Sequence, residues 1–171
     1  MVSIIILTTG KAENVLECLK DQTYQDFEVI LANEKGCANA LNLALARAKG
    51  DIFIRVDDDV EIPRHWLENL IAPFDDPKIA GATGPTYVPQ EQRANRDSIR
   101  WAENPHWFLK WLYDNNEFKP GGIRKCGCVS YDSNYSERFI DIEIFEPAHL
   151  EGTNFSARTE LLRKVGGFDL K

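Results

Sequence analysis

The first 60 residues alternate between two hydrophobic patterns, and this alternation constrains the fold more than any other feature of the sequence. Residues 2–8 form an apolar, β-branched run that is typical of a buried parallel strand, and residues 27–32 and 51–56 are the second and third predicted strands. Between them, residues 11–21 and 37–49 carry apolar side chains at helical spacing. A strand–helix–strand–helix–strand order predicts a parallel sheet with helices on both faces, the α/β class.

The rest of the chain is less regular but carries further predicted elements. We expect helices over 64–74, 91–102, 105–113 and 159–165, strands over 79–83 and 138–145, and a long polar loop over 114–136. No repeat or linker interrupts this pattern, so we expect a single domain over residues 1–171.

Composition narrows the class of protein. The 171 residues carry 27 acidic and 20 basic side chains, a formal net charge of −7, and no long basic stripe, which argues against nucleic acid as a partner. The longest apolar runs are too short to span a bilayer and no signal segment opens the chain, so we expect a cytoplasmic protein without a transmembrane segment. The four cysteines, of which only Cys126 and Cys128 are close, fit neither a disulfide framework nor a zinc site.

The loops that follow the three predicted strands are the expected place for chemistry. In an open parallel sheet, ligands bind beyond the carboxyl ends of the strands. These ends lead into residues 8–11, 33–36 and 57–63. We therefore expect one binding site at this edge of the sheet.

Three consecutive carboxylates, Asp57, Asp58 and Asp59, follow the third predicted strand directly. Side chains alternate along a strand, so Asp57 and Asp59 are expected to point the same way. Two such carboxylates can share Mg²⁺, which takes one or two protein carboxylates together with waters and substrate phosphates. This site suits a nucleoside diphosphate. The alternative is that the aspartates only end the strand and cap the next helix.

Residues 50–60, Gly-Asp-Ile-Phe-Ile-Arg-Val-Asp-Asp-Asp-Val, resemble the Asp-x-Asp (DXD) signature of family 2 glycosyltransferases, which have the GT-A fold. Further segments resemble the same family in collinear order: 2–6, 26–30, 36–42, 62–68, 76–84, 152–158 and 166–169. The resemblance implies a Rossmann-like, mostly parallel sheet with helices on both faces and a smaller acceptor-side extension. It divides the domain into a nucleotide-sugar-binding half, 1–86, and an acceptor-side half, 87–171, which we expect to be truncated at its C-terminus.

The resemblance also implies an activity. A family 2 glycosyltransferase moves a sugar from a nucleoside-diphosphate-sugar donor to an acceptor hydroxyl with inversion, using a divalent metal. The family's positions for contacts with the nucleotide sugar correspond to Thr8, Thr9, Asn33, Glu34, Asn42, Asp57 and Asp58. Asp57 and Asp59 correspond to the ligands of Mn²⁺ or Mg²⁺.

The pair Asn33-Glu34 and the residue Asn42 leave alternatives open. Asn33-Glu34 stands where the family usually has an aspartate that contacts the base, so a UDP-sugar is expected but guanine and thymine stay open. Asn42 is placed either near the ribose or as a brace for the loop.

The general base is less clearly placed than the donor site. In the family it comes from an acidic pair beyond the Gly-Gly-Phe-Asp stretch, and the sequence stops at Lys171. Glu151 and Asp169 are the remaining candidates. The alternative for Asp169 is that it caps a helix or turn. For Glu151, a role in the donor pocket or in the structure is as compatible with the sequence as catalysis.

The acceptor is expected to be a saccharide or a lipid-linked molecule. Trp107 and Trp111 share a helix face and suit an acceptor platform or, alternatively, core packing. A lipid-linked acceptor would place the protein at the inner face of a membrane.

Three other functions compete with this interpretation. A haloacid-type phosphatase carries Asp-x-Asp after its first strand, with Thr or Val where this chain has Glu61. A sugar-nucleotide pyrophosphorylase opens with a Gly-rich, Arg-containing loop, which residues 8–11 do not provide. A module that binds nucleotide sugar and metal without efficient catalysis is the third.

Overall fold

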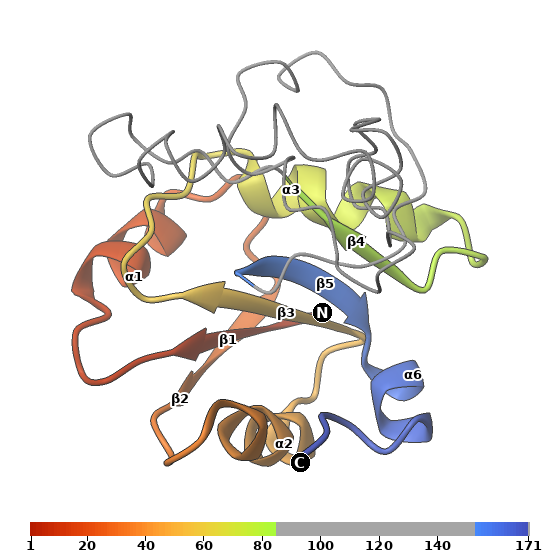
Figure 1. Ribbon diagram of the computed structural model, residues 1–171. Coiled ribbons are helices and arrows are strands. Elements are labelled where there is room, and N and C mark those ends of the chain that lie inside the picture. The colour runs from red at the N-terminus through yellow and green to blue at the C-terminus, as the bar shows by residue number, and fades with distance from the viewer. Residues whose placement is uncertain (85–152, 171) are drawn as a thin grey trace, which may run out of the picture. The chain divides into compact units, whose positions relative to one another are not determined.

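The computed structural model describes residues 1–84 and 153–170, and its centre is a five-stranded sheet in the order β2-β1-β3-β5-β4 (Figure 1). The strands are β1 (Val2–Leu7), β2 (Phe27–Ala32), β3 (Ile52–Asp57), β4 (Gly81–Thr83) and β5 (Asn154–Arg158). The helices are α1 (Glu13–Lys20), α2 (Cys37–Arg47), α3 (Trp66–Ile71) and α6 (Thr159–Lys164), with a 3₁₀ helix, η1 (Ala72–Asp75). These elements belong to one compact unit formed by residues 1–84 and 151–171.

The parallel part of the sheet is confirmed. β1 pairs in parallel with β2 on one side and with β3 on the other. Leu7 lies opposite both Ala32 and Asp57, so the three strands end at the same level. Their carboxyl ends therefore form one edge of the sheet, as the sequence predicts.

β5 is the element that the sequence analysis did not predict. It runs antiparallel to β3 and to β4, and so lies between them. The five residues have only two apolar side chains, Phe155 and Ala157, and this makes a weak strand signal. Ser156 is nevertheless fully buried, because its hydroxyl donates a hydrogen bond to the carbonyl of Ala82 at 3.0 Å.

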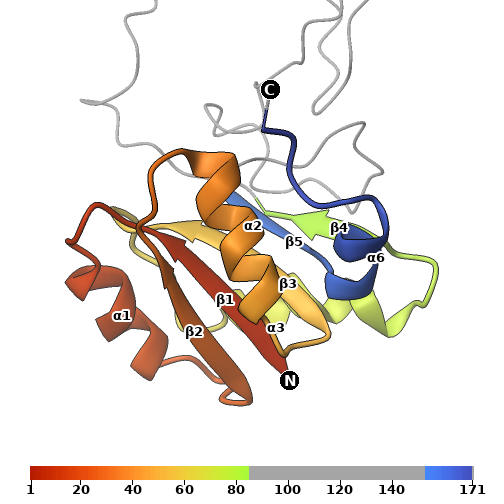
Figure 2. The ribbon, with the colours of Figure 1, turned by 90° about the horizontal axis from the view of Figure 1, so that it is seen from below.

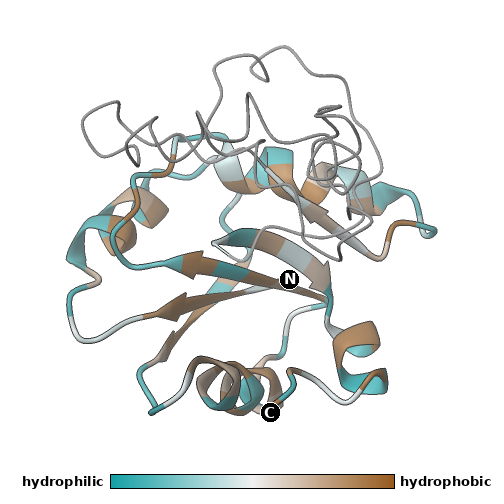
Figure 3. Ribbon diagram, in the orientation of Figure 1, coloured by the Kyte–Doolittle hydropathy of each residue, from teal (hydrophilic) through white to brown (hydrophobic). Residues whose placement is uncertain are grey.

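Helices cover both faces of the sheet, as predicted (Figure 2). On one face, α1 and α3 pack on alternate residues of β1 and β3. The core there consists of Val2, Ile4, Ile6, Ala12, Val15, Leu19, Ile52, Ile54, Val56, Trp66, Leu67 and Leu70. On the other face lie α2, which packs against β1 and β2, and α6, which packs against β5. Figure 3 shows β1 and β3 as largely hydrophobic and β5 as more polar.

The chain after α6 returns to the face covered by α2. The ring of Phe168 lies 5.9 Å from that of Phe53 and 6.2 Å from that of Phe155. The side-chain amide of Asn42 on α2 holds the same segment, since it donates to the carbonyl of Phe168 and accepts from its N–H, both at 2.8 Å. The segment at 166–169, which the sequence analysis singled out, is thus fastened to a helix that precedes it by over a hundred residues.

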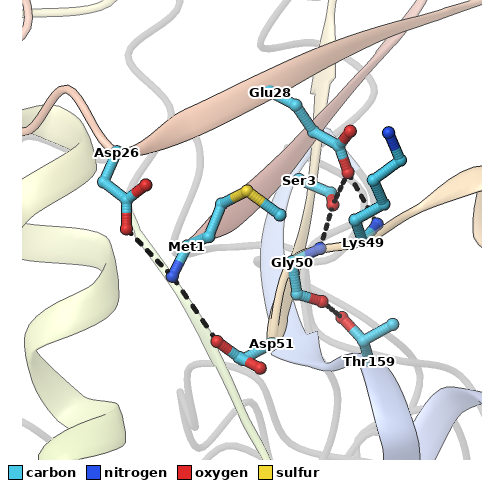
Figure 4. A network of polar contacts seen from close by, with 8 residues as sticks. All are labelled: Met1, Ser3, Asp26, Glu28, Lys49, Gly50, Asp51 and Thr159. Carbon is cyan, nitrogen blue, oxygen red and sulfur yellow. Dashed lines mark hydrogen bonds and ion pairs between the residues drawn. The ribbon is translucent and has the colours of Figure 1, made fainter.

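A polar network closes the amino ends of the strands (Figure 4). The buried hydroxyl of Ser3 donates to Glu28 at 2.7 Å and accepts from the N–H of Gly50 at 2.8 Å. Glu28 also accepts from the N–H of Lys49 at 2.6 Å, and the hydroxyl of Thr159 donates to the carbonyl of Gly50 at 2.6 Å. The network therefore joins β1, β2, the start of β3 and α6.

One further prediction is corrected in detail, and several others lie outside the residues that the structure describes. The helix expected over 64–74 is divided into α3 and η1, because Pro73 has no N–H to continue the α-helical hydrogen bonds. The helices at 91–102 and 105–113, the loop at 114–136, the strand at 138–145, and Trp107, Trp111, Cys126 and Cys128 lie outside the described residues. Within residues 1–84 and 153–170, no helix has the length and apolar character needed to cross a membrane.

Candidate functional site

The carboxyl edge of β1, β2 and β3 is where the structure brings the predicted loops together. The N–H of Thr8 donates to the carbonyl of Ala32 at 3.1 Å, which extends the β1–β2 pairing one residue beyond the strands. The N–H of Thr9 donates to a carboxylate oxygen of Asp58 at 3.3 Å, which links the loops after β1 and β3. The site therefore forms where the three strands end.

Thr8 shapes the first of these loops. Its hydroxyl accepts hydrogen bonds from the N–H groups of Gly10 at 2.9 Å and Lys11 at 3.2 Å. Gly10 has a φ of 114°, a conformation that side-chain-bearing residues rarely adopt. These bonds fix the turn that leads from β1 into α1, with Thr8 half-buried and Thr9 exposed.

Only the first of the three aspartates belongs to the strand. β3 ends at Asp57, and Asp58 and Asp59 form a turn. Strand alternation therefore does not apply between Asp57 and Asp59, because β3 ends two residues before Asp59, and their shared role stays a prediction. Asp57 and Asp58 are half-buried and Asp59 is exposed.

The environment of Asp57 is electrostatically unusual. Burial raises the pKa of its carboxyl group, and the nearby charges of Asp59 and Asp58 raise it further, while Arg55 opposes them. The guanidinium of Arg55 donates to Oδ1 of Asp57 at 2.9 Å. A cation close to Asp57 would favour the charged form of its carboxyl group.

Arg55 is a site residue that sequence reasoning missed. The signal was present, because an arginine interrupts the apolar run of β3 at a position where the neighbouring residues are buried. The sequence analysis treated it only as part of a longer signature.

The loop after β2 presents Asn33, which is exposed, and Glu34, whose side chain is 28% exposed. Oε1 of Glu34 lies 3.9 Å from the guanidinium of Arg47, a distance that gives only a weak ion pair. Its other oxygen, Oε2, is buried and, within the described part of the chain, accepts no hydrogen bond. Glu34 thus retains acceptor capacity at this edge of the sheet.

The other predicted site residues have different surroundings. Asn42 uses both ends of its amide group to hold the backbone of Phe168 in the segment after α6, and its role toward the nucleotide sugar stays a prediction. Asp169 is exposed and directly follows Phe168. Glu151 lies outside the described residues, and the roles of Glu151 and Asp169 as candidate bases stay predictions.

The donor set suits a hard divalent cation that shares its ligands with a substrate. Within the ranges 1–84 and 153–170, no three Asp, Glu, His or Cys side chains are grouped so that they could hold a metal ion. Two aspartates at one strand end are compatible with the coordination of Mg²⁺ or Mn²⁺, which in nucleotide sites is completed by waters and phosphate oxygens. These residues thus fit a divalent cation only if a substrate phosphate and waters supply the rest of its ligands.

A mostly parallel sheet with one antiparallel strand and helices on both faces defines an α/β fold, in which ligands bind at the carboxyl ends of the strands. The sequence profile of Glycosyl transferase family 2 matches residues 4–130, and the chain belongs to this family. No curated protein matches the sequence.

Solved structures of glycosyltransferases are similar to the chain in fold. One is the mannosyltransferase PcManGT from Pyrobaculum calidifontis in complex with GDP-Man and Mn²⁺, with a TM-score of 0.53 and 18% identity over 98% of this chain and 47% of that one. Another is TarS 1–349 from S. aureus, with a TM-score of 0.55 and 18% identity over 98% and 49%. The chain spans about half the length of these proteins. At such identities the likeness shows the fold, which is GT-A.

Proposed function

We propose that this chain binds a nucleoside-diphosphate sugar at the carboxyl edge of β1, β2 and β3 and transfers the sugar to an acceptor hydroxyl with inversion. The observation that carries the proposal is the aspartate cluster at the end of β3, where the half-buried Asp57 and Asp58 are held by Arg55 and by the N–H of Thr9. Membership of the family and the GT-A fold support it.

Asp57 and Asp59 are the proposed protein ligands of the divalent cation. When bound, the cation would neutralise the charge that develops on the departing diphosphate. The chain's own residues prepare the site, since the N–H of Thr9 holds Asp58 and Arg55 holds Asp57. These contacts fix two of the three aspartates before any ligand arrives.

We assign the nucleoside to the loops after β1 and β2. Thr8 and Thr9 line one side, and Asn33 and Glu34 the other, with the carboxylate of Glu34, whose side chain is 28% exposed, as an acceptor for an N–H of the base. Uracil and guanine both present such a group. The similar mannosyltransferase was solved with GDP-Man, which supports testing GDP beside UDP.

Transfer needs a carboxylate that takes the proton from the acceptor hydroxyl. Glu151 and Asp169 are the proposed candidates for this base. The acceptor, a saccharide or a lipid-linked molecule, and a cytoplasmic location remain predictions from the sequence.

Calorimetric titration with UDP and GDP, with and without Mn²⁺, tests the proposal. Asp59→Asn removes one cation ligand while keeping the size of an exposed side chain, so we expect Mn²⁺-dependent nucleotide binding to fall at least tenfold, on the order of one lost charged ligand. Glu61→Gln is the matched control, since it removes an exposed carboxylate two residues further along the loop. Equal Mn²⁺-dependent binding by Asp59→Asn and the unchanged protein would show that the cation site is elsewhere.

A further inference from the structure

Arg55 is a charged side chain in the interior of the sheet, and the proposed reaction assigns it no direct contact with substrate. Its neighbours Ile54 and Val56 point into the core under α1 and α3, so Arg55 lies on the opposite face, as does Asp57. Its side chain is only 17% exposed. Burial of a guanidinium group is costly unless the charge is paired, so this position requires a partner.

The partner is Asp57, and the pairing is incomplete. Arginine and a carboxylate can form two parallel hydrogen bonds. In the part of the chain that the structure describes, only one of these hydrogen bonds forms, from Nη2 of Arg55 to Oδ1 of Asp57 at 2.9 Å. Nε of Arg55 is buried and has no hydrogen-bond partner among the described residues. Arg55 therefore engages one oxygen of Asp57, and Oδ2 is left for another ligand.

The charges around the end of β3 are unbalanced. Asp57, Asp58 and Asp59 bring three negative charges, and Arg55 neutralises one of them. Within residues 1–84 and 153–170, the protein offers no group of three metal-ligating side chains. A cation at this position therefore needs additional oxygens, and a diphosphate supplies both oxygens and negative charge.

We propose that Arg55 acts as a built-in counter-ion that makes cation binding at this site depend on the nucleotide. Its charge opposes a cation that arrives alone. A cation already neutralised by a diphosphate has little net charge and is opposed far less. The inference rests on the proposed function, because it takes the aspartate cluster as the cation site.

The size of the effect follows from Coulomb's law. A positive unit charge about 7 Å from a divalent cation lowers the affinity of the site for that cation roughly tenfold, even with the dielectric constant of water. Removal of the charge is expected to raise the affinity for the cation alone by about this factor. The affinity for the cation–nucleotide complex should change much less.

Electron paramagnetic resonance of free Mn²⁺, measured with the full chain at pH 8, tests this inference. Binding of Mn²⁺ is measured alone and with UDP or GDP, for the unchanged protein, Arg55→Met and Arg55→Lys. We expect Arg55→Met to bind Mn²⁺ alone roughly tenfold more tightly, so that the enhancement by nucleotide falls by a similar factor. Arg55→Lys keeps the charge and should keep the enhancement. Arg64→Met, which removes an exposed arginine in the loop before α3, should change neither value.

Two results would overturn the inference in a protein whose circular dichroism is unchanged. One is an Arg55→Met variant in which nucleotide enhances Mn²⁺ binding as much as before. The other is weaker binding of Mn²⁺ alone, which would make Arg55 a mechanical support for Asp57. If Arg55→Met does not fold, Arg55→Gln provides the same removal of charge. An unchanged protein that binds no Mn²⁺ even with either nucleotide would refute the proposed function itself, and this inference with it.

Discussion

Replacement of Asn42 by alanine distinguishes the two roles that the sequence left open for this residue. In the structure its amide group makes two hydrogen bonds of 2.8 Å to the backbone of Phe168. The ring of Phe168 in turn packs against Phe53 and Phe155. Asn42 is therefore expected to hold the segment after α6 in place, and its loss should reduce stability before it affects ligand binding.

The magnitude can be worked from these contacts. Each hydrogen bond contributes about 1 kcal/mol net, and a buried backbone group left without a partner adds to the loss. We expect Asn42→Ala to lower the free energy of unfolding by about 2–3 kcal/mol. For a chain of this size that corresponds to a fall in Tm of roughly 5–10 °C. The Mn²⁺-dependent affinity for UDP or GDP should be unchanged at temperatures where the variant stays folded.

Differential scanning calorimetry and nucleotide titration on the same samples provide the assay. Asn39→Ala is the matched control, because Asn39 is exposed on the same helix and, within the described residues, its side chain donates one longer hydrogen bond, 3.3 Å, to the carbonyl of Lys35. Its Tm should fall by far less. An Asn42→Ala protein with unchanged Tm and weakened nucleotide binding would refute the bracing role and assign Asn42 to the ribose.

Three further predictions concern the fold that carries the site. Gly167→Ala should destabilise at least as much as Asn42→Ala, since Gly167 has a φ of 80° and an added Cβ would overlap Oδ1 of Asn42; thermal unfolding checks this. Gly50→Ala should reduce soluble yield or lower Tm strongly, because a Cβ there would collide with the backbone of Ser3, and wild-type stability would contradict the packing. Hydrogen bonds from the Ser3 hydroxyl and the Lys49 N–H lower the pKa of Glu28 below its ordinary value of 4.5. The charged carboxylate of Glu28 therefore stabilises the folded state above pH 4.5, and this stabilisation is lost as the pH falls through the lowered pKa. Urea unfolding of Glu28→Gln between pH 3 and 7 should therefore show a weaker dependence on pH than the unchanged protein.

The residues of the first three strands show how much of the fold the local hydrophobic pattern predicts. Continuous β-branched runs such as 2–7 can lower their free energy only by burial on both faces, which requires helices on both sides. The pattern therefore predicts β1, β2, β3 and the helices between them, and it predicts that their carboxyl ends meet. The bounds differ by only one or two residues, because strand and helix ends depend on local hydrogen bonds.

β5 shows where local pattern is insufficient. Asn154, Ser156 and Arg158 give this segment a polar composition, and nothing local predicts that it lies in the middle of a sheet. Its strand conformation depends on β3 and β4, which supply backbone hydrogen-bond partners on both sides. It also depends on the carbonyl of Ala82, which accepts a hydrogen bond from the Ser156 hydroxyl. These partners are about seventy to a hundred residues away in the sequence, so only the folded chain brings them together.

The candidate site divides in the same way. The sequence by itself determined that carboxylates follow β3 and that hydroxyl and amide side chains follow β1 and β2, because strand order and residue type are local properties. Only the tertiary structure decided that β3 stops at Asp57, that Arg55 neutralises that carboxylate from the buried side, and that Asn42 is committed to Phe168. Burial, charge pairing and hydrogen bonds between distant segments depend on which surfaces meet, and that is set by the packing of the whole unit.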